Sequence, residues 1–393
     1  MKKLLILLLL FTVHSADAQL KNGDQLPELQ FKELLNAPFK SVSSNQLKGK
    51  IILLEFWATW CGSCLAAMPH LQTLQTKYPN SLQVIAVGDE STVRTAQYLK
   101  SKPANFWFAI DTSRKISEAF PHQLIPHTVL IDAEGKLIGS TYPEAITEKV
   151  MDSLLRKQKI HLPAKIDQLI NHEDLIKQQF FAADSTTYRF MMQAEIKGGP
   201  GLSTTWLKDK AFAGRRLTCI NLPLTSVYRI ANGDFPYTRS IEETASEKNE
   251  ALYCLDLIVN SPLDLLPALQ LELSKRFDLQ ARIQPTIKEV QVLRIINPIK
   301  FNAIKRNRTG QRTYYSRHGE IDQEAITMND FAQFLENYGL NQLVADETGN
   351  QEKLDIKFSF QPENPKSLLD ILEGMGLGLV KEKRSVDLLI LYK

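Results

Sequence analysis

The chain has little excess of charge of either sign. Its 393 residues carry 47 Lys and Arg against 44 Asp and Glu, which leaves a formal net charge of +3. So small a charge gives no electrostatic case for nucleic acid, whose binding requires a basic patch or stripe. The densest basic run is Lys305-Arg306-Asn307-Arg308, followed by Arg312, and such a run is typical of a solvated loop. We therefore expect no nucleic acid among the partners.

Long apolar runs are absent after the first residues. The opening stretch has a positive start at Lys2 and Lys3, a short apolar core over 4–13 and the small-x-small pattern Ala16-Asp17-Ala18, which is the form of a secretory signal. The core is shorter than the about 20 residues that a membrane span needs. No Cys stands directly after the signal, which argues against a lipid anchor at the mature N-terminus. We expect a signal peptide over 1–18 and a soluble mature protein without a stable membrane span, in the periplasm of a Gram-negative bacterium.

Cysteine is rare: the chain holds Cys61, Cys64, Cys219 and Cys254. In an oxidising compartment a close pair works by redox chemistry more often than it holds zinc. A zinc site would need two further ligands, and no matching pair of histidines accompanies Cys61 and Cys64. The pattern therefore predicts no metal. Cys219 and Cys254 are widely spaced, so in an exported protein they form either a structural disulfide or two buried thiols.

A chain of this length is expected to form two domains. In residues 19–157 buried strands alternate with helices, and a hairpin and an amphipathic helix close the segment, which indicates an α/β sheet covered on both faces. Residues 158–179 are polar and weakly periodic, so we expect a linker. Within residues 180–393 the segments 252–295 and 354–392 both have the pattern of strand, helix, strand and strand. This repeat predicts an α+β domain built from two related β-α-β-β units.

The close cysteine pair lies where a strand gives way to a helix. The run "GKIILLEFWATW" predicts a buried strand over 50–57, and from Cys61 to Tyr78 the apolar spacing becomes helical. A helix N-terminus supplies free N–H groups and a positive potential, which stabilise a thiolate. Cys61 can therefore attack a disulfide in a partner, and Cys64, one turn later, can resolve the mixed disulfide. The alternative is a disulfide without turnover.

The surrounding pattern resembles the thioredoxin fold, and within it the exported TlpA-like thiol–disulfide oxidoreductases. The resemblance rests on "NGDQLPELQF", "LKGKIILLEFWATWC" and "IPHTVLIDAEGKLIG", in this order within residues 20–157. It implies a mixed sheet with flanking helices, Cys61 as nucleophile, Cys64 as resolving thiol and Pro126 in a cis-proline loop that receives the substrate chain as an added strand. It also implies no cofactor beyond the Cys61–Cys64 disulfide. The implied partners are exported proteins bearing disulfides or thiols, and a membrane electron donor.

Two residues before the dithiol are further candidates. Glu55 lies inside the apolar strand, where an unpaired carboxylate is costly to bury. By the resemblance, Glu55 would relay protons for the resolving cysteine; the alternative is a side chain that reaches solvent past the strand end. Trp60, adjacent to Cys61, is expected to line the substrate groove.

Other positions bear on specificity and on the direction of electron flow. Ile125, before Pro126, is expected to contact substrate and resembles the residue of reducing thioredoxins. Ser63, Ala67 and His127 depart from the usual residues of the branch. Ser63 and His127 are therefore candidates to modulate the dithiol, and the alternative for His127 is a partly exposed neighbour. These departures leave the potential open.

The second half carries no Ser/His/Asp set, metal cluster or phosphate loop. The stretches "LQLELSKRFDLQARIQPTIKEVQVLRI", "VADETGNQEKLDIKFSF" and "SLLDILEGMGLGLVKEKRSVDLLILY" resemble an uncharacterised family found in exported proteins of soil bacteria, over residues 180–393. We expect a binding or docking module. The whole sequence thus predicts an exported thiol–disulfide oxidoreductase that reduces or exchanges disulfides in periplasmic proteins. The alternative is a binding protein whose thioredoxin-like domain is a redox-sensory or inactive appendage.

Overall fold

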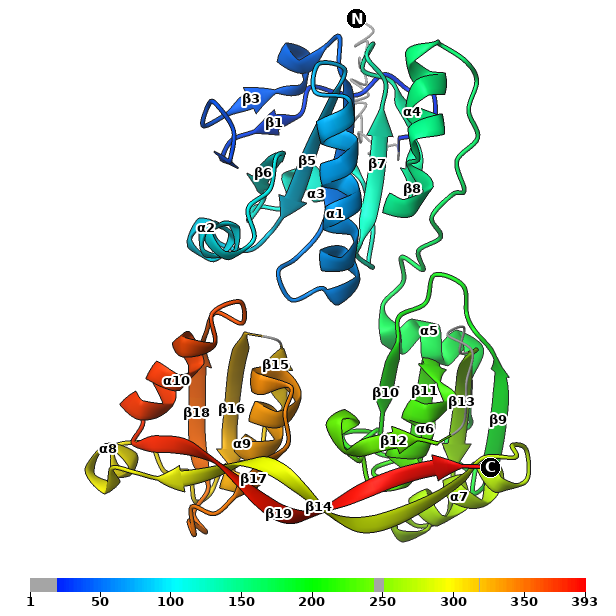
Figure 1. The fold of residues 1–393 in the computed structure, drawn as a ribbon. Helices are drawn as coiled ribbons and strands as arrows, with labels where there is room; N and C mark the ends of the chain where they lie inside the picture. Colours follow the sequence, from blue (N-terminus) through cyan, green and yellow to red (C-terminus); the bar gives the residue numbers. More distant parts are fainter. Residues whose placement is uncertain (1–19, 244–250, 318) are drawn as a thin grey trace, which may run out of the picture.

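The computed structural model of the chain describes residues 20–243, 251–317 and 319–393 (Figure 1). The signal peptide expected over 1–18 lies outside these residues. Among the described residues, no helix has the length and apolar character to cross a membrane.

The first part of the chain folds around a six-stranded mixed sheet with the order β2-β6-β5-β4-β7-β8. Strands β4, β5 and β6 are parallel, whereas β2, β7 and β8 run antiparallel to their neighbours. The sheet strands are β2 (Leu34–Leu35), β4 (Ile51–Phe56), β5 (Leu82–Gly88), β6 (Trp107–Ile110), β7 (His127–Ile131) and β8 (Leu137–Thr141). A separate short pair is β1 (Gln30–Phe31) and β3 (Val42–Ser43), and the helices are α1 (Gly62–Lys77), α2 (Thr92–Ser101), α3 (Lys115–Ala119) and α4 (Glu148–Leu155). The architecture confirms the predicted α/β thioredoxin-like fold.

Both faces of this sheet carry a hydrophobic core, which explains why all six residues of β4 are buried. Side chains alternate between the faces along a strand. Leu53 and Trp57 pack into the core that α1, α2 and α4 cover, whereas Leu54 and Phe56 face the core beneath α3. Glu55 lies two positions from Leu53 and two from Trp57, so its side chain points to the same face, which α1 covers.

The linker after α4 is shorter than predicted. Residues 156–171 are irregular but follow the edge of the sheet, where the backbone N–H of Lys165 donates to the carbonyl of Ser140. The expected linker over 158–179 ends early, because its last residues form α5 (His172–Gln179). Apolar side chains of α5 are buried against Phe180 in the next part of the chain, so this helix belongs to the second region.

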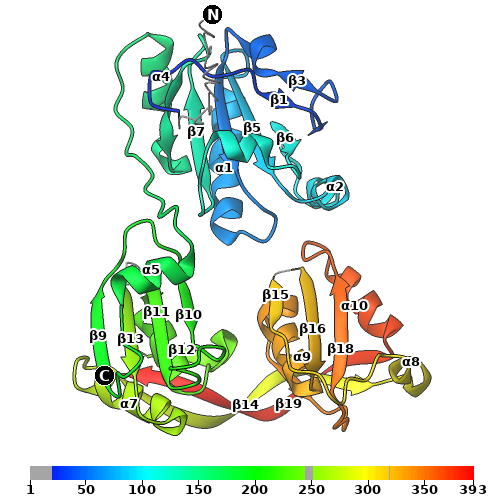
Figure 2. The ribbon, with the colours of Figure 1, turned by 180° about the vertical axis from the view of Figure 1, so that it is seen from behind.

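The second region has two lobes joined by a long two-stranded ribbon, β14 (Gln280–Ile295) with β19 (Leu377–Tyr392) (Figures 1 and 2). The first lobe contains α5, β9 (Arg189–Ala194), β10 (Leu202–Thr204), β11 (Arg216–Pro223), α6 (Leu224–Ala231), β12 (Ser240–Glu242), β13 (Leu252–Ile258) and α7 (Leu265–Ser274). The second lobe contains α8 (Pro298–Asn302), β15 (Tyr315–Arg317), β16 (Glu320–Ile326), α9 (Met328–Phe334), β17 (Val344–Asp346), β18 (Leu354–Ser359) and α10 (Pro365–Gly374). One end of the ribbon packs into each lobe, with Leu389 in the first core and Leu293 in the second.

This region confirms the predicted α+β class, and the repeat takes a simpler form than predicted. Each unit is a strand, a helix and one long strand (β13-α7-β14 and β18-α10-β19), in place of the expected β-α-β-β. The reason is that β14 and β19 pair with each other at all sixteen positions, which holds both strands extended through the expected breaks. Pro285 is tolerated within β14 because the second neighbour of that strand, β17, pairs only with residues 291–293.

Candidate active site

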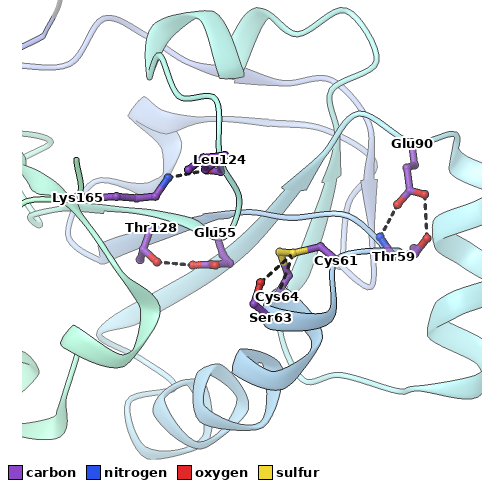
Figure 3. Close-up of a disulfide and its surroundings, with 9 residues drawn as sticks. All are labelled: Glu55, Thr59, Cys61, Ser63, Cys64, Glu90, Leu124, Thr128 and Lys165. Atoms are coloured by element: carbon purple, nitrogen blue, oxygen red, sulfur yellow. Dashed lines mark hydrogen bonds between the residues drawn. A yellow bond between two sulfur atoms is a disulfide. The ribbon is translucent and has the colours of Figure 1, made fainter. Parts of the chain in front are cut away.

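The predicted dithiol forms a disulfide at the start of α1, with 2.05 Å between the sulfur atoms (Figure 3). Cys61 is the N-cap residue of the helix, and its Sγ accepts a hydrogen bond of 3.2 Å from the backbone N–H of Cys64. Cys61 is 6% exposed and Cys64 is fully buried, so a partner reaches the Cys61 sulfur first. The free N–H groups and dipole at the start of a sixteen-residue helix favour negative charge there. This geometry suits a thiolate on Cys61 in the reduced protein.

Glu55 is completely buried, so its side chain does not reach solvent past the strand end. It lies opposite Thr128 in the β4–β7 pairing, and the Thr128 hydroxyl donates to Glu55 Oε2 at 2.6 Å. The other carboxyl oxygen, Oε1, has no hydrogen-bond partner among the described residues. In the view of Figure 3 the carboxyl lies between Thr128 and the disulfide. Strand parity and this view therefore place Glu55 on the same face of the sheet as Cys64.

The burial of Glu55 changes its protonation. Loss of solvation raises the pKa of Glu55 to about 8, because a charge is costly where water is excluded. The hydrogen bond from Thr128 and the positive charge of Lys165 lower this pKa, whereas the charge of Glu144 raises it. The carboxyl can therefore take up and release a proton near neutral pH, as a proton acceptor requires.

The loop ahead of β7 brings together the residues expected to contact substrate. The Ile125–Pro126 peptide bond is cis, as the resemblance implied. Ile125 and Trp60 line a small hollow of about 210 Å³, together with Phe56 and His122. Trp60 is 39% exposed, which leaves an aromatic surface beside the buried dithiol. The structure thus gathers Trp60, Ile125 and Pro126 around one end of the sheet, although they are far apart in the sequence.

Comparisons with known proteins agree with this geometry. Residues 21–155 match the Redoxin family, and residues 241–393 match a protein family of unknown function, DUF3738. The thiol–disulfide oxidoreductase ResA of Bacillus cereus (strain ZK / E33L) is 32% identical over 120 residues, which cover 30% of this chain and 69% of that protein. The chain belongs to the ResA-like thiol–disulfide oxidoreductases.

Other relatives of the ResA-like part match over similar lengths. The thioredoxin-like protein YneN of Bacillus subtilis is 29% identical over 147 residues, which cover 37% of this chain and 84% of that protein. A solved structure described as a putative thiol:disulfide interchange protein DsbE from Chlorobium tepidum is 27% identical, with a TM-score of 0.31, and the match covers 34% of this chain and 99% of that one. As a ResA-like enzyme, this protein is a thiol–disulfide oxidoreductase with a thioredoxin fold.

The alternative for His127, a partly exposed neighbour of the dithiol, is wrong because the side chain is buried. It is 3% exposed and lies opposite Phe56, on the face of the sheet away from Glu55. Its ring stacks on His122 with 4.6 Å between the ring centres. Burial, assisted by the charge of Lys165, lowers the pKa of His127 to about 3, so the ring is neutral at physiological pH. Ser63, the other candidate modulator, has its Oγ 3.5 Å from Cys61 Sγ.

A polar network that the sequence did not indicate joins the loop before the dithiol to the second lobe. The backbone N–H and hydroxyl of Thr59 donate to the carboxylate of Glu90 at 2.6 and 2.8 Å. Arg94 donates from Nε to the Thr59 hydroxyl at 2.9 Å and from both terminal nitrogens to Glu363, at 3.2 and 3.4 Å. Glu363 lies 269 positions beyond Arg94, so no local pattern could have signalled this contact.

Of the two alternatives for Cys219 and Cys254, the structure has the second: they form no disulfide with each other, and both are buried thiols. Cys219 pairs across the β11–β13 ladder with Leu255, the residue next to Cys254. Because neighbours along a strand point to opposite faces, one thiol enters the core that contains Leu255 and the other the core against α5. Burial raises the pKa of Cys219 to about 12, which is typical of an inert structural thiol. Within the described ranges, no cluster of His, Cys, Asp and Glu is arranged to hold a metal ion.

Proposed function

We propose that this protein is exported and reduces disulfides in periplasmic partner proteins. The observation that carries the proposal is the position of Cys61, which caps α1 beside the exposed ring of Trp60 and is the more accessible sulfur of the pair. Ile125 before the cis-proline, which resembles the residue of reducing thioredoxins, favours reduction over oxidation.

The reaction begins with the reduced dithiol. The Cys61 thiolate attacks one sulfur of the partner disulfide and the partner's S–S bond breaks, which leaves a mixed disulfide. The other partner sulfur leaves as a thiolate and takes up a proton from solvent. Glu55 then accepts the proton of Cys64, whose thiolate attacks Cys61 Sγ. The S–S bond to the partner breaks and the Cys61–Cys64 disulfide forms, while the second partner sulfur leaves as a thiolate and takes up a proton from solvent. Two electrons pass to the partner, and a membrane electron donor returns them to the dithiol.

The second region is proposed to act as a docking module for the partner. Support comes from the contact between Arg94 and Glu363, because Arg94 also holds Thr59, two residues before Cys61. Figures 1 and 2 place the two lobes on the side of the thioredoxin-like fold from which α1 begins. A partner that approaches the dithiol would therefore meet this region as well.

Insulin reduction with dithiothreitol as electron source tests the activity. We expect turnover by the mature protein, loss of turnover to the uncatalysed rate in Cys61→Ser, and full turnover in the matched control Cys219→Ser. Activity that survives Cys61→Ser contradicts the assignment. A measured potential well outside the range of about −270 to −120 mV of known catalysts favours the sensory alternative.

Trapping identifies the partners. Cys64→Ser removes the resolving sulfur, so partners from a periplasmic extract should remain on Cys61 as mixed disulfides that dithiothreitol releases. The double variant Cys61→Ser/Cys64→Ser is the control and should retain none. Equal recovery with both variants would contradict exchange through Cys61.

A further inference from the structure

A buried ion pair lies beside the cis-proline loop and has no role in the steps above. Lys165 and Asp167 belong to the segment after α4, beyond residue 155 where the Redoxin match ends. Their side chains are 4% and 7% exposed, and Lys165 Nζ donates to Asp167 Oδ2 at 2.7 Å. Lys and Asp are rarely buried to this extent, since removing both charges from water is costly even when they pair.

The pair holds the backbone that leads into the cis-proline. Lys165 Nζ donates to the carbonyl oxygen of Leu124 at 2.5 Å, and the backbone N–H of Leu124 donates to Asp167 Oδ1 at 3.2 Å. Both backbone polar groups of Leu124 are therefore bound by the same ion pair. The Gln123 side chain adds a bond of 2.9 Å to the carbonyl of Ile170. The segment after the domain thus anchors residues 123 and 124, immediately before the residue expected to contact substrate.

The same ammonium group acts on the buried carboxyl of the active site. The charge of Lys165 lowers the pKa of Glu55, and the charge of Glu55 in turn raises the pKa of Lys165, whose own burial lowers it. The other groups that act on Glu55 are Thr128 from β7 and Glu144 from the turn before α4. Lys165 Nζ also lies 3.4 Å from Nδ1 of the neutral His127 ring, and Asp167 Oδ2 is 3.7 Å from the same nitrogen. The charge of Lys165 lowers the pKa of the neighbouring His122, whereas the charge of Asp167 raises it.

We propose that Lys165 and Asp167 are positioning residues for the dithiol reaction, which fix the loop before Pro126 and place a positive charge near Glu55. The inference rests on the proposed role of Glu55 as proton acceptor. The segment after α4 then contributes to the active site, in addition to connecting the thioredoxin-like fold to the second region.

Without the charge of Lys165, Glu55 keeps its proton to a higher pH and accepts the Cys64 proton less readily. The variant Lys165→Met removes the charge and the donors. Lys165→Gln removes the charge but can still donate to the carbonyl of Leu124, so it separates the two contributions. The matched control is Lys159→Met, an exposed lysine in the same segment.

The test measures insulin reduction by the full chain between pH 6 and 9. In both Lys165 variants we expect the midpoint of the pH–rate profile to rise by about one pH unit, which corresponds to up to about tenfold slower turnover on the acidic side of the midpoint. Lys165→Met should also raise KM, because the loop is released, whereas Lys165→Gln should raise it less. Lys159→Met should leave both quantities unchanged. Far-UV circular dichroism verifies that each variant is folded.

Combination with Glu55→Gln separates the two proposals. If Lys165 acts through Glu55, Lys165→Gln should cause no further change of the pH profile when Glu55 is already Gln. If Glu55→Gln alone shifts the profile but neither Lys165 variant does, the present inference is overturned and the role of Glu55 stands. If Glu55→Gln leaves the profile unchanged, both are overturned.

Discussion

Replacement of Glu55 by Gln should stabilise the oxidised protein, and the gain should grow with pH. The carboxyl is buried with a pKa raised to about 8 from its ordinary value of 4.5, so the folded protein keeps this proton where the unfolded chain has lost it. Stability falls with rising pH wherever the native state binds more protons than the unfolded state. The wild-type protein should therefore lose stability from about pH 4.5 to about pH 8, and Gln, which does not ionise, should not.

The size of the effect follows from the two pKa values. Their difference is about 3.5, and a pKa difference of one corresponds to about 1.4 kcal/mol, so the penalty approaches about 5 kcal/mol above pH 8. Below pH 4.5 the carboxyl is protonated in both states, and Gln resembles it in shape. The Gln side-chain carbonyl can still accept the hydrogen bond from Thr128. The difference in stability between Glu55→Gln and wild type should therefore be near zero at pH 4 and reach several kcal/mol at pH 8.5.

Urea unfolding of the oxidised proteins at a series of pH values measures this difference. Trp fluorescence is a suitable signal, because three of the four tryptophans (Trp57, Trp60 and Trp107) lie in the thioredoxin-like fold. The control is Glu28→Gln, an exposed carboxylate in the same fold, which should change stability by less than about 0.5 kcal/mol at every pH. A difference between Glu55→Gln and wild type that stays constant from pH 5 to 8.5 would refute the argument that burial raises the pKa of Glu55.

Three further outcomes are expected. Thr128→Val removes the hydrogen bond that lowers the pKa of Glu55, so the midpoint of the pH–rate profile should rise by up to about one unit; an unchanged profile would argue against this bond as a control on the carboxyl. Glu363→Gln weakens the ion pair with Arg94, which holds the loop before Cys61. A partly buried pair contributes about 1 kcal/mol, so with the restraint weakened iodoacetamide should alkylate the reduced dithiol about fivefold faster. The exposed control Glu373→Gln should not change this rate, and equal rates in all three proteins would mean that the second lobe does not restrain the site. Thiol titration of the unfolded, unreduced protein should find two thiols, because the two cysteines outside the dithiol are unbonded; no thiols would indicate a second disulfide.

The dithiol and its fold could be predicted because their signals are local in the sequence. The apolar run before Cys61, the helical spacing after it and "IPHT" downstream each describe a short stretch, and the structure forms the elements that they predict. The expected β-α-β-β units were wrong in detail because pairing between β14 and β19, about a hundred positions apart, carries both strands through sites that locally resemble turns. The sequence left open whether Cys219 and Cys254 form a disulfide, because the answer depends on the cross-strand register, which sends the two thiols to opposite faces of one sheet.

The sequence alone determined which atoms react, since a cysteine pair at a strand-to-helix junction places one sulfur at a helix N-terminus whatever surrounds it. Only the tertiary structure decided the surroundings that we propose control the reaction. The pKa of Glu55 is set by complete burial and by neighbours that include Lys165. The loop before Cys61 is hydrogen-bonded through Thr59 to Arg94, which in turn donates to Glu363. Desolvation and the contacts of charged groups are properties of the whole packed chain. Glu55 and Lys165 lie 110 positions apart and Arg94 and Glu363 lie 269 apart, so no local sequence pattern links either pair.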